Sequence, residues 1–460
     1  MRYNLDMRIA CVHVPQFGLQ SLGRIDPSLR GAAVAVVGAG LEPAPGVRPS
    51  LALHSPIVVA CSRAAWTLGV RLGMTATAAR FASSELRVVA ADSPLERETV
   101  RAIADALLGV STVVDTGGRV GAGAAHLAMY CEVPARTRGT SFGGRLIELL
   151  DSVGIAARIG IADDRFTAWV AAAHGAEGSS AREDRGVVSV PRGGSAAFLA
   201  PRPLSLLAIT PEVQHMLEAL GVRTLGEFAA LPAPSVSRPL EADYQALARG
   251  DSGSALRPYA PEGPIREELL VSTAGSLFGG AAAVATLAER LALRLAGRAR
   301  GAARLELTVA GEGGETTISI VADTAASSQD ALVELLAPQI GEAPGAVLRL
   351  RAVIVGEAVV GAVVASAEAE AAEVAELAPP IDAVSAALSG VGMRPPGSLS
   401  ARQAALAQLA EPDRSLPWQL SAPETLRAER RDAHRRTRRA RQRRRTVPLA
   451  QSQLFGQIDG

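Results

Sequence analysis

The side chains that most often perform catalysis or bind metals are scattered along this chain. Cys11, Cys61 and Cys131 lie far apart, and the six histidines are equally dispersed. This spacing excludes a disulfide framework and predicts neither a metal site nor a bound cofactor. His13 and Cys61 lie near the ends of apolar segments, where a buried core residue is far commoner than a ligand or a nucleophile.

The densest chemical feature is a run of arginines near the carboxyl end. The chain contains no Lys, so all 47 basic residues are Arg, and eleven of them lie between Arg427 and Arg445. Because only Glu429 and Asp432 oppose them, this segment carries a formal charge of +9 in a chain whose total is +1. It is a candidate for binding DNA phosphates irrespective of base sequence. The candidate DNA-binding residues are Arg430, Arg431, Arg435, Arg436, Arg438, Arg439, Arg441, Arg443, Arg444 and Arg445.

The arginine run has a second interpretation. Its interruptions by Glu429, Asp432 and His434 are compatible with a solvated helix that carries i,i+4 pairs and docks a protein partner. No aromatic residue lies between 425 and 446, so base stacking by this segment is not expected. Phosphate binding is favoured, with protein docking nearly equal.

Composition predicts a folded chain of several domains. The 460 residues are 48% hydrophobic and 20% charged, which suggests about three domains of ~100–200 residues each. Asp6 and Arg8 interrupt the first segment, which is unlike a signal peptide. The longest apolar stretch contains Glu357 and is too short to cross a bilayer. A soluble cytoplasmic protein without membrane contact is expected.

The pattern of elements changes twice along the chain. Strand-like segments at 7–14, 32–37 and 56–61 alternate with helical spacing through about residue 200, which predicts an α/β layer. Short helices broken at Gly221 and Gly226 follow. After a Gly/Pro-rich linker, the order β-α-β-β-α-β predicts a split-βαβ unit. The fold class is therefore mixed α/β and α+β, in several domains.

Four segments in register resemble the Y-family DNA polymerases. CSRAAWTLGVRLGM is similar to their fingers motif, and ARIGIADDRFTAWVA is similar to a palm motif. LEALGVRTLGEFAAL resembles their helix–hairpin–helix thumb, and the split-βαβ unit stands where their little finger stands. The resemblance implies a palm with fingers at 1–200 (fingers about 30–85), a thumb-like unit at 201–255 and a little-finger-like unit at 262–367. A C-terminal partner-binding and Arg-rich tail would occupy 368–460.

The carboxylates that this family uses to hold metal ions are missing. The first motif falls on HVPQFG, so His13 and Pro15 stand at the positions of the acids. No acid lies between Asp6 and Asp26, and none lies from Thr116 to Cys131. Nucleotidyl transfer needs two divalent ions held by carboxylate oxygens. We therefore expect no catalytic residues and no polymerase activity.

The residues that contact the nucleotide in this family have also changed. Register places Arg63 at the family's Tyr and Trp66 at its Arg. In the palm motif, Asp164 and Arg165 replace Asn-Lys, and Trp169 replaces the second Lys. The grip on a triphosphate is thus expected to be lost together with the metal site.

This pattern of losses resembles the ImuB-type group, which are polymerase-like factors of damage-induced (SOS) mutagenesis and DNA repair. The resemblance implies an adaptor that links the sliding clamp, DNA, an ImuA-type protein and an error-prone C-family polymerase during translesion synthesis at the replication fork. Gln451, Leu454 and Phe455 match the Q-x-x-L-F form of bacterial clamp-binding peptides. Leu and Phe can fill an apolar pocket while Gln contacts its rim. Two alternatives remain: an active low-fidelity Y-family polymerase, and a DNA-tethering protein without clamp contact.

Overall fold

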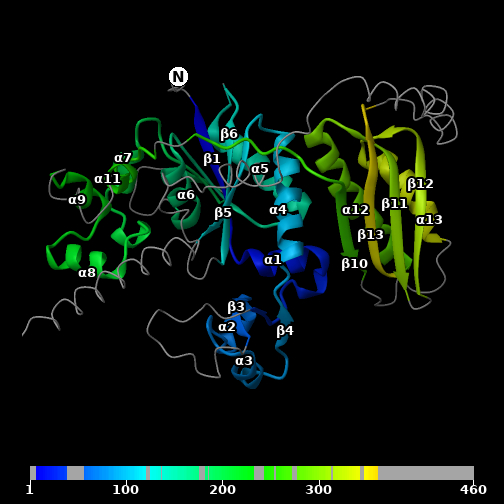
Figure 1. The fold of residues 1–460 in the computed structure, drawn as a ribbon, viewed down its shortest axis with the longest axis horizontal. Helices are drawn as coiled ribbons and strands as arrows, with labels where there is room; N and C mark the ends of the chain where they lie inside the picture. Colours follow the sequence, from blue (N-terminus) through cyan, green and yellow to red (C-terminus); the bar gives the residue numbers. More distant parts are fainter. Residues whose placement is uncertain are drawn as a thin grey trace, which may run out of the picture.

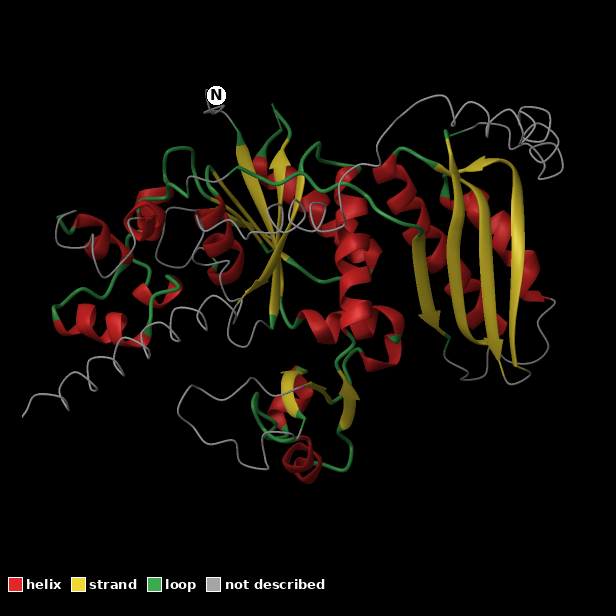
Figure 2. Cartoon of the chain, in the orientation of Figure 1, coloured by secondary structure: helices red, strands yellow, loops and turns green. Residues whose placement is uncertain are grey.

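The computed structural model describes residues 7–38, 56–120, 125–135, 137–175, 182–184, 186–232, 243–252, 255–271, 277–311, 314–341 and 347–360. These residues form a mixed α/β chain of several layers (Figures 1 and 2). The arginine run and the Gln451–Phe455 peptide lie outside the described residues. None of the described helices is long and apolar enough to span a membrane.

A six-stranded sheet with the order β5-β6-β1-β7-β9-β8 forms the centre. Strand β1 (Arg8–Val14) pairs antiparallel with β6 (His126–Val133) and β7 (Arg158–Ala162). The edges are β5 (Val114–Val120) on one side and β9 (Val187–Ser189) with β8 (Arg182–Asp184) on the other. The apolar run of β1 is buried because helices cover both faces of this sheet.

Alternate residues of β1 pack against different helices, as strand geometry requires. Ala10, Val12 and Val14 lie in one core with residues of α4 (Ser93–Leu108) and α5 (Gly139–Val153). Ile9 and Cys11 lie in the other core, with α6 (Arg165–His174) and the helical unit that follows it. His13 shares the alternation of Ile9 and Cys11 and so points to the α6 side.

A small lobe is inserted between β1 and α4. It begins after α1 (Phe17–Ile25) and the short helix η1 (Pro27–Leu29). Strands β2 (Val34–Gly38), β3 (Ile57–Cys61) and β4 (Arg87–Ala90) form a three-stranded sheet, against which α2 (Arg63–Thr67) and α3 (Ala76–Ala82) pack. The lobe lies below the central sheet in Figure 1.

An all-helical unit follows the central sheet. It contains α7 (Ser195–Leu199), η4 (Leu204–Leu206), α8 (Pro211–Ala219), α9 (Leu225–Ala230) and α11 (Asp243–Ala248). Thr224 and Glu227 form a capping box that starts α9. Hydrogen bonds from the backbone N–H groups of Arg223 and Thr224 lower the pKa of Glu227. Its carboxylate therefore has a structural role in the turn between α8 and α9.

A second, four-stranded antiparallel sheet follows, with the order β10-β13-β11-β12. Its strands are β10 (Ile265–Leu270), β11 (Gly301–Gly311), β12 (Gly314–Ala326) and β13 (Val347–Ala358). Helices α12 (Leu277–Arg298) and α13 (Gln329–Gly341) contribute to the core on one face of it. The other face carries the polar side chains that alternate with the core residues.

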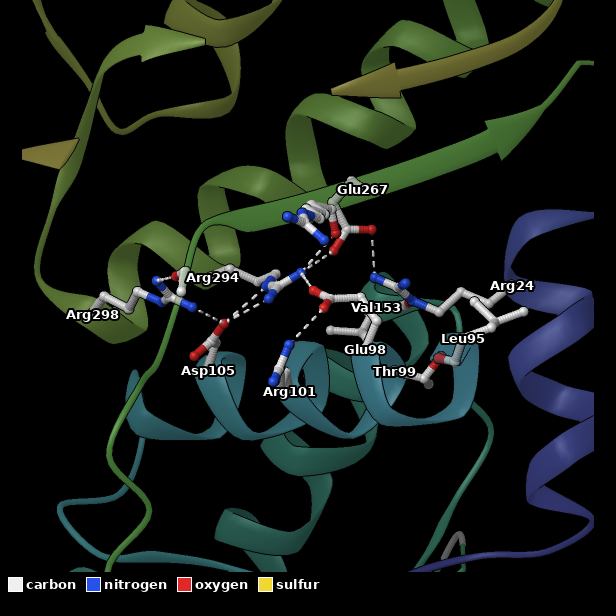
Figure 3. A network of polar contacts seen from close by, with 12 residues as sticks. Arg24, Leu95, Glu98, Thr99, Arg101, Asp105, Val153, Glu267, Arg294 and Arg298 are labelled. Carbon is white, nitrogen blue, oxygen red and sulfur yellow. Dashed lines mark hydrogen bonds and ion pairs between the residues drawn. The ribbon is translucent and has the colours of Figure 1, made fainter. Parts of the chain in front are cut away.

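Helix α12 also packs against α4, and a buried ionic network lies between them (Figure 3). Arg294 bonds to Asp105 at 2.9 Å and to Glu267 at 3.0 Å. Arg24 of α1 binds the other oxygen of Glu267, and Arg298 bonds to Asp105 at 3.0 Å. All five side chains are at most 6% exposed. Residues far apart in sequence thus fix the second sheet to the helical face of the first.

Candidate functional site

The carboxyl end of β1 carries His13, followed by Pro15, the two positions at which the resemblance to Y-family polymerases led us to look for metal-binding acids. His13 is 6% exposed there, and Pro15 offers no side-chain donor or acceptor. Burial, together with the basic neighbours His126, His174 and Arg158, lowers the pKa of His13 to about 4. The imidazole of His13 is therefore neutral at physiological pH, and it is surrounded by basic groups.

Strand β5, on the far side of β6 from β1, carries glycine at the same level. Ala128 of β6 pairs with His13 on one side and with Gly118 on the other, so the three positions lie in one row across the sheet. A bulge separates Asp115 from Gly118, and Gly117 has a φ of +57°. A Cβ at Gly117 would lie 1.9 Å from the carbonyl oxygen of Ala128, so no carboxylate fits there.

Asp115 is the acid of β5, and both of its oxygens are engaged. Oδ1 accepts a hydrogen bond from the N–H of Gly117 at 2.8 Å. Oδ2 accepts from Arg165 at 2.9 Å and from the backbone N–H of Arg257 at 2.8 Å. The guanidinium of Arg165 also lies 4.2 Å above the ring of Tyr130. Asp115 thus joins β5 to α6 and to the linker before β10, rather than facing a ligand.

The two acids that begin α6 lie at the opposite end of β1 from His13. Because β7 runs antiparallel to β1, Asp163 lies beside Arg8, at 3.4 Å. Asp164 caps α6 by accepting from the N–H of Thr167 at 2.9 Å, and burial raises its pKa to about 6. Within the described ranges, no group of three or more His, Cys, Asp or Glu residues could hold a metal ion.

The small lobe presents Arg63 and Trp66 on its surface. Arg63 is exposed and begins α2, and Trp66 is 49% exposed. The Arg71 guanidinium lies 4.1 Å over the Trp66 ring, a cation–π contact between neighbouring parts of the lobe. Trp169, by contrast, packs against the core around α6 and lies 5.8 Å from the ring of Phe166. The residues at the family's nucleotide-contacting positions therefore do not converge on one site.

The three cysteines are buried and unbonded, as expected for core residues. Burial raises the pKa of each thiol, to about 12 for Cys131. A raised pKa keeps the sulfur protonated and unreactive. None of the three is therefore a nucleophile or a thiolate ligand.

The sequence indicated the position of His13 but not which residues surround it. His126, His174 and Arg158 come from β6, the end of α6 and β7, and only the strand register brings them together. No spacing in the sequence connects them. The Gly117–Gly118 bulge was likewise hidden, although an unbroken stretch without acids was visible.

Comparisons with known proteins give a family match for the first third of the chain. Residues 12–173 match the model of the impB/mucB/samB family (IMS). DNA polymerase IV of Dehalococcoides mccartyi strain CBDB1 is 34% identical over 107 residues, which are 23% of this chain and 26% of that polymerase. The same enzyme from strain BAV1 is 37% identical over 82 residues, 18% of this chain and 19% of its own length. The match thus spans about a quarter or less of these curated relatives.

Two solved structures are similar to the chain over a longer range. DinB from Sulfolobus solfataricus is 14% identical, with 77% of this chain and 100% of that one covered, at a TM-score of 0.41. The insertion ternary complex of Dbh DNA polymerase is 13% identical, with 78% and 100% covered, at a TM-score of 0.43.

Proposed function

We propose that this chain, a relative of the Y-family DNA polymerases over residues 12–173, is a non-catalytic adaptor in damage-induced translesion synthesis. In this role it holds DNA, engages the sliding clamp through its tail, and brings an error-prone C-family polymerase and an ImuA-type protein to the replication fork. The observation that carries the proposal is the replacement of the metal-binding end of β1 by a neutral, buried His13 and a glycine bulge.

The geometry supports the loss of catalysis on physical grounds. Two-metal chemistry needs carboxylates that converge on one point. Here Asp115 is neutralised by Arg165, and Asp163 lies beside Arg8 at the far end of the strand. The fixed charge of Arg158, which pairs with His13 across the strands, would oppose a divalent cation at this position.

The open face of the four-stranded sheet is the surface of the body best suited to hold DNA. Strand alternation places Arg304 on this face, opposite the buried Leu305 and Leu307. Arg349 and Arg351 of β13 lie on the same face, and both pair with Glu268, at 3.6 and 3.2 Å. Such partly exposed pairs are weak and can be exchanged for contacts with phosphates.

Clamp binding is supported by the sequence alone. Gln451, Leu454 and Phe455 stand beyond the arginine run, where a peptide can reach a pocket on a partner. The test is titration of the full chain against purified sliding clamp, beside the Leu454→Ala/Phe455→Ala double variant. Micromolar binding that disappears in the double variant, with unchanged DNA binding, is expected. Equal binding by both proteins would reduce the peptide to coincidence and favour a tether without clamp contact.

Primer extension tests the competing polymerase interpretation. We expect no extension above background with Mg²⁺ or Mn²⁺ on damaged or undamaged templates. Extension that a His13→Gln variant abolishes would contradict the proposal, because it would place chemistry at the end of β1. DNA binding is measured in parallel so that loss of binding is not mistaken for loss of catalysis.

A further inference from the structure

Four basic side chains meet at the carboxyl end of β1 on the side of α6. His13 of β1 pairs directly with Arg158 of β7, and residues that face each other across strands share a face of the sheet. His126 lies two positions from Ala128, the other partner of His13, and therefore points to the same side. The rings of His13 and His126 are 5.3 Å apart. These groups form one cluster.

The end of α6 completes the cluster. Arg158 donates a hydrogen bond to the carbonyl of Ala173 at 3.4 Å, next to His174 in the last turn of the helix. His174 and Arg158 are exposed, His126 is half-buried, and His13 lies beneath them. The cluster thus has an accessible rim and a buried base.

The hydrogen-bonding groups of the cluster are arranged as donors. The Nδ1 of His126 accepts from the backbone N–H of Gln16 at 3.1 Å, so in the neutral ring the proton lies on Nε2. The buried Nδ1 of His13 has no hydrogen-bond partner among the described residues. Arg158 has five N–H donors, and the contact with Ala173 occupies only one of them. Donors remain for a ligand that only accepts.

The charges around the cluster are also of one sign. Two arginines outside the cluster also lower pKa values within it. Arg119 lowers the pKa of His126, and Arg202 lowers the pKa of His174. Arg119 is itself paired with Glu96 of α4, at 3.1 Å. With the histidines neutral, the fixed charge of Arg158 beside His13 favours an anion over a cation at the cluster.

Space for a ligand remains beside the cluster. Gly118 lies in the same row of the sheet as His13, one strand beyond Ala128. A Cβ at Gly118 would meet no heavy atom within 4 Å. The absence of a side chain on β5 leaves this part of the surface open next to His126.

We propose that His13, His126, His174 and Arg158 form a binding site for a phosphate group at the position where related polymerases hold metal ions. The ligand chemistry is that of a phosphate monoester or diester, from a nucleic-acid chain or from free phosphate. Arg158 supplies the fixed charge, and the imidazoles supply N–H donors. The site does not depend on the proposed adaptor role, since inorganic phosphate alone can occupy it.

Histidine-selective NMR on the full chain tests the proposal. The ring carbon signals are assigned with single His→Gln variants, and inorganic phosphate is titrated at low ionic strength. Saturable shifts of His13, His126 and His174 are expected, while His215 on α8 serves as an internal control. His434, within the arginine run, reports separately on binding by the tail.

Three variants separate the site from general charge effects. Arg158→Gln is expected to weaken phosphate binding at the three histidines roughly tenfold, the loss of one charge-assisted contact. Arg145→Gln, an exposed arginine on α5, removes the same charge from the other face of the sheet and should change nothing. Gly118→Asp places a carboxylate in the open space and should abolish binding without removing a donor.

Oligonucleotides then identify the source of the phosphate. Shifts caused only by a 5′-phosphorylated strand indicate a terminal monoester, and shifts that persist without the terminal phosphate indicate the backbone diester. Shifts of His434 alone, or equal phosphate affinity at the three histidines in Arg158→Gln and the unmodified chain, would overturn the proposal. These results are independent of clamp titration, so the two proposals can fail separately.

Discussion

Glu267 is the residue on which the docking of the second sheet depends most directly. Its carboxylate lies between Arg24 of α1 and Arg294 of α12 and is 1% exposed (Figure 3). The substitution Glu267→Gln keeps the size of the side chain and removes its charge. Two buried guanidinium groups would then lose the carboxylate that they share.

The expected cost follows from burial. Removing one partner of a buried ion pair costs about 3–5 kcal/mol, because the remaining charge is left without compensation. Arg290, which is 3% exposed and also lowers the pKa of Glu267, adds to this uncompensated charge. The loss is a large part of the total stability of a domain, about 5–15 kcal/mol.

Urea unfolding and hydrogen exchange measure this cost. In the unmodified chain, the network should make residues of α4 and α12 exchange slowly and together. In Glu267→Gln, the unfolding midpoint should fall, and exchange should accelerate in α12, β10 and the facing side of α4. Changing Arg24 and Glu267 to Met together should recover part of the loss, since the charge of Arg24 is then removed and Arg294 keeps its ion pair with Asp105.

The adjacent residue provides the control. Glu268 points to the open face of the same strand and pairs with Arg349 and Arg351, which are 43% and 41% exposed. Glu268→Gln should therefore cost only about 0–1 kcal/mol. If Glu267→Gln costs no more than Glu268→Gln, the network does not hold the two sheets together and the reasoning fails.

Acid should act on the same contact. Burial alone would raise the pKa of Glu267, but Arg24, Arg294 and Arg290 outweigh it and hold the pKa below its ordinary value. A carboxylate with a lowered pKa stabilises the folded state above its unfolded pKa, and this contribution is lost as pH falls through the folded value. Hydrogen exchange in α12 should therefore accelerate only below about pH 4, near the ordinary pKa of Glu.

Three further predictions concern the central sheet. Asp164→Asn should raise stability at neutral pH by on the order of 2 kcal/mol, because burial raises the pKa of Asp164 to about 6 and penalises its charge. Thermal melts should show this gain in stability shrinking as pH falls through 6 towards the ordinary pKa of 3.8. Gly117→Ala should cost at least about 2 kcal/mol in urea unfolding, since its Cβ would meet the carbonyl of Ala128 at 1.9 Å, whereas Gly118→Ala, with nothing within 4 Å, should be nearly neutral. The lowered pKa of His13, about 4, means that the unfolded chain takes up a proton that the folded chain does not, so stability should fall between about pH 6.5 and 4. His13→Asn should flatten that part of the pH profile, and an unchanged profile would refute the assignment. The basic groups that face His13 are His126, His174 and Arg158.

Several elements of the fold could be predicted from local sequence because their own apolar patterns are clear. The apolar run that ends at Val14 predicted β1, and the apolar segments at 32–37 and 56–61 lie within one residue or two of β2 and β3. Helix α4 lies in the part of the chain, up to about residue 200, where helical spacing was expected to alternate with strands. In each case the pattern of side chains on the strand or helix itself determines the structure.

Other features depend on pairing and were not accessible from the sequence. The sequence shows a stretch without acids from Thr116 to Cys131, but not that β5 runs through it to Val120, because only the bulge allows Gly118 to keep pairing with β6. Similarly, Arg24 and Glu267 are 243 positions apart and belong to different layers. Charged residues in amphipathic segments predict solvent contact, and only the packing of α1 against β10 shows that these two are buried.

The network between the two sheets also constrains how the chain can be made. Asp105 accepts hydrogen bonds from Tyr259, Arg294 and Arg298, all more than 150 residues later in the chain. During synthesis on the ribosome, Asp105 of α4 therefore lacks the full set of these partners until the last turn of α12 has emerged. A ribosome that stalls before this point leaves a nascent protein in which Asp105 lacks at least one of these three partners. Folding of the N-terminal half is thus completed only when α12 of the C-terminal half packs onto α4.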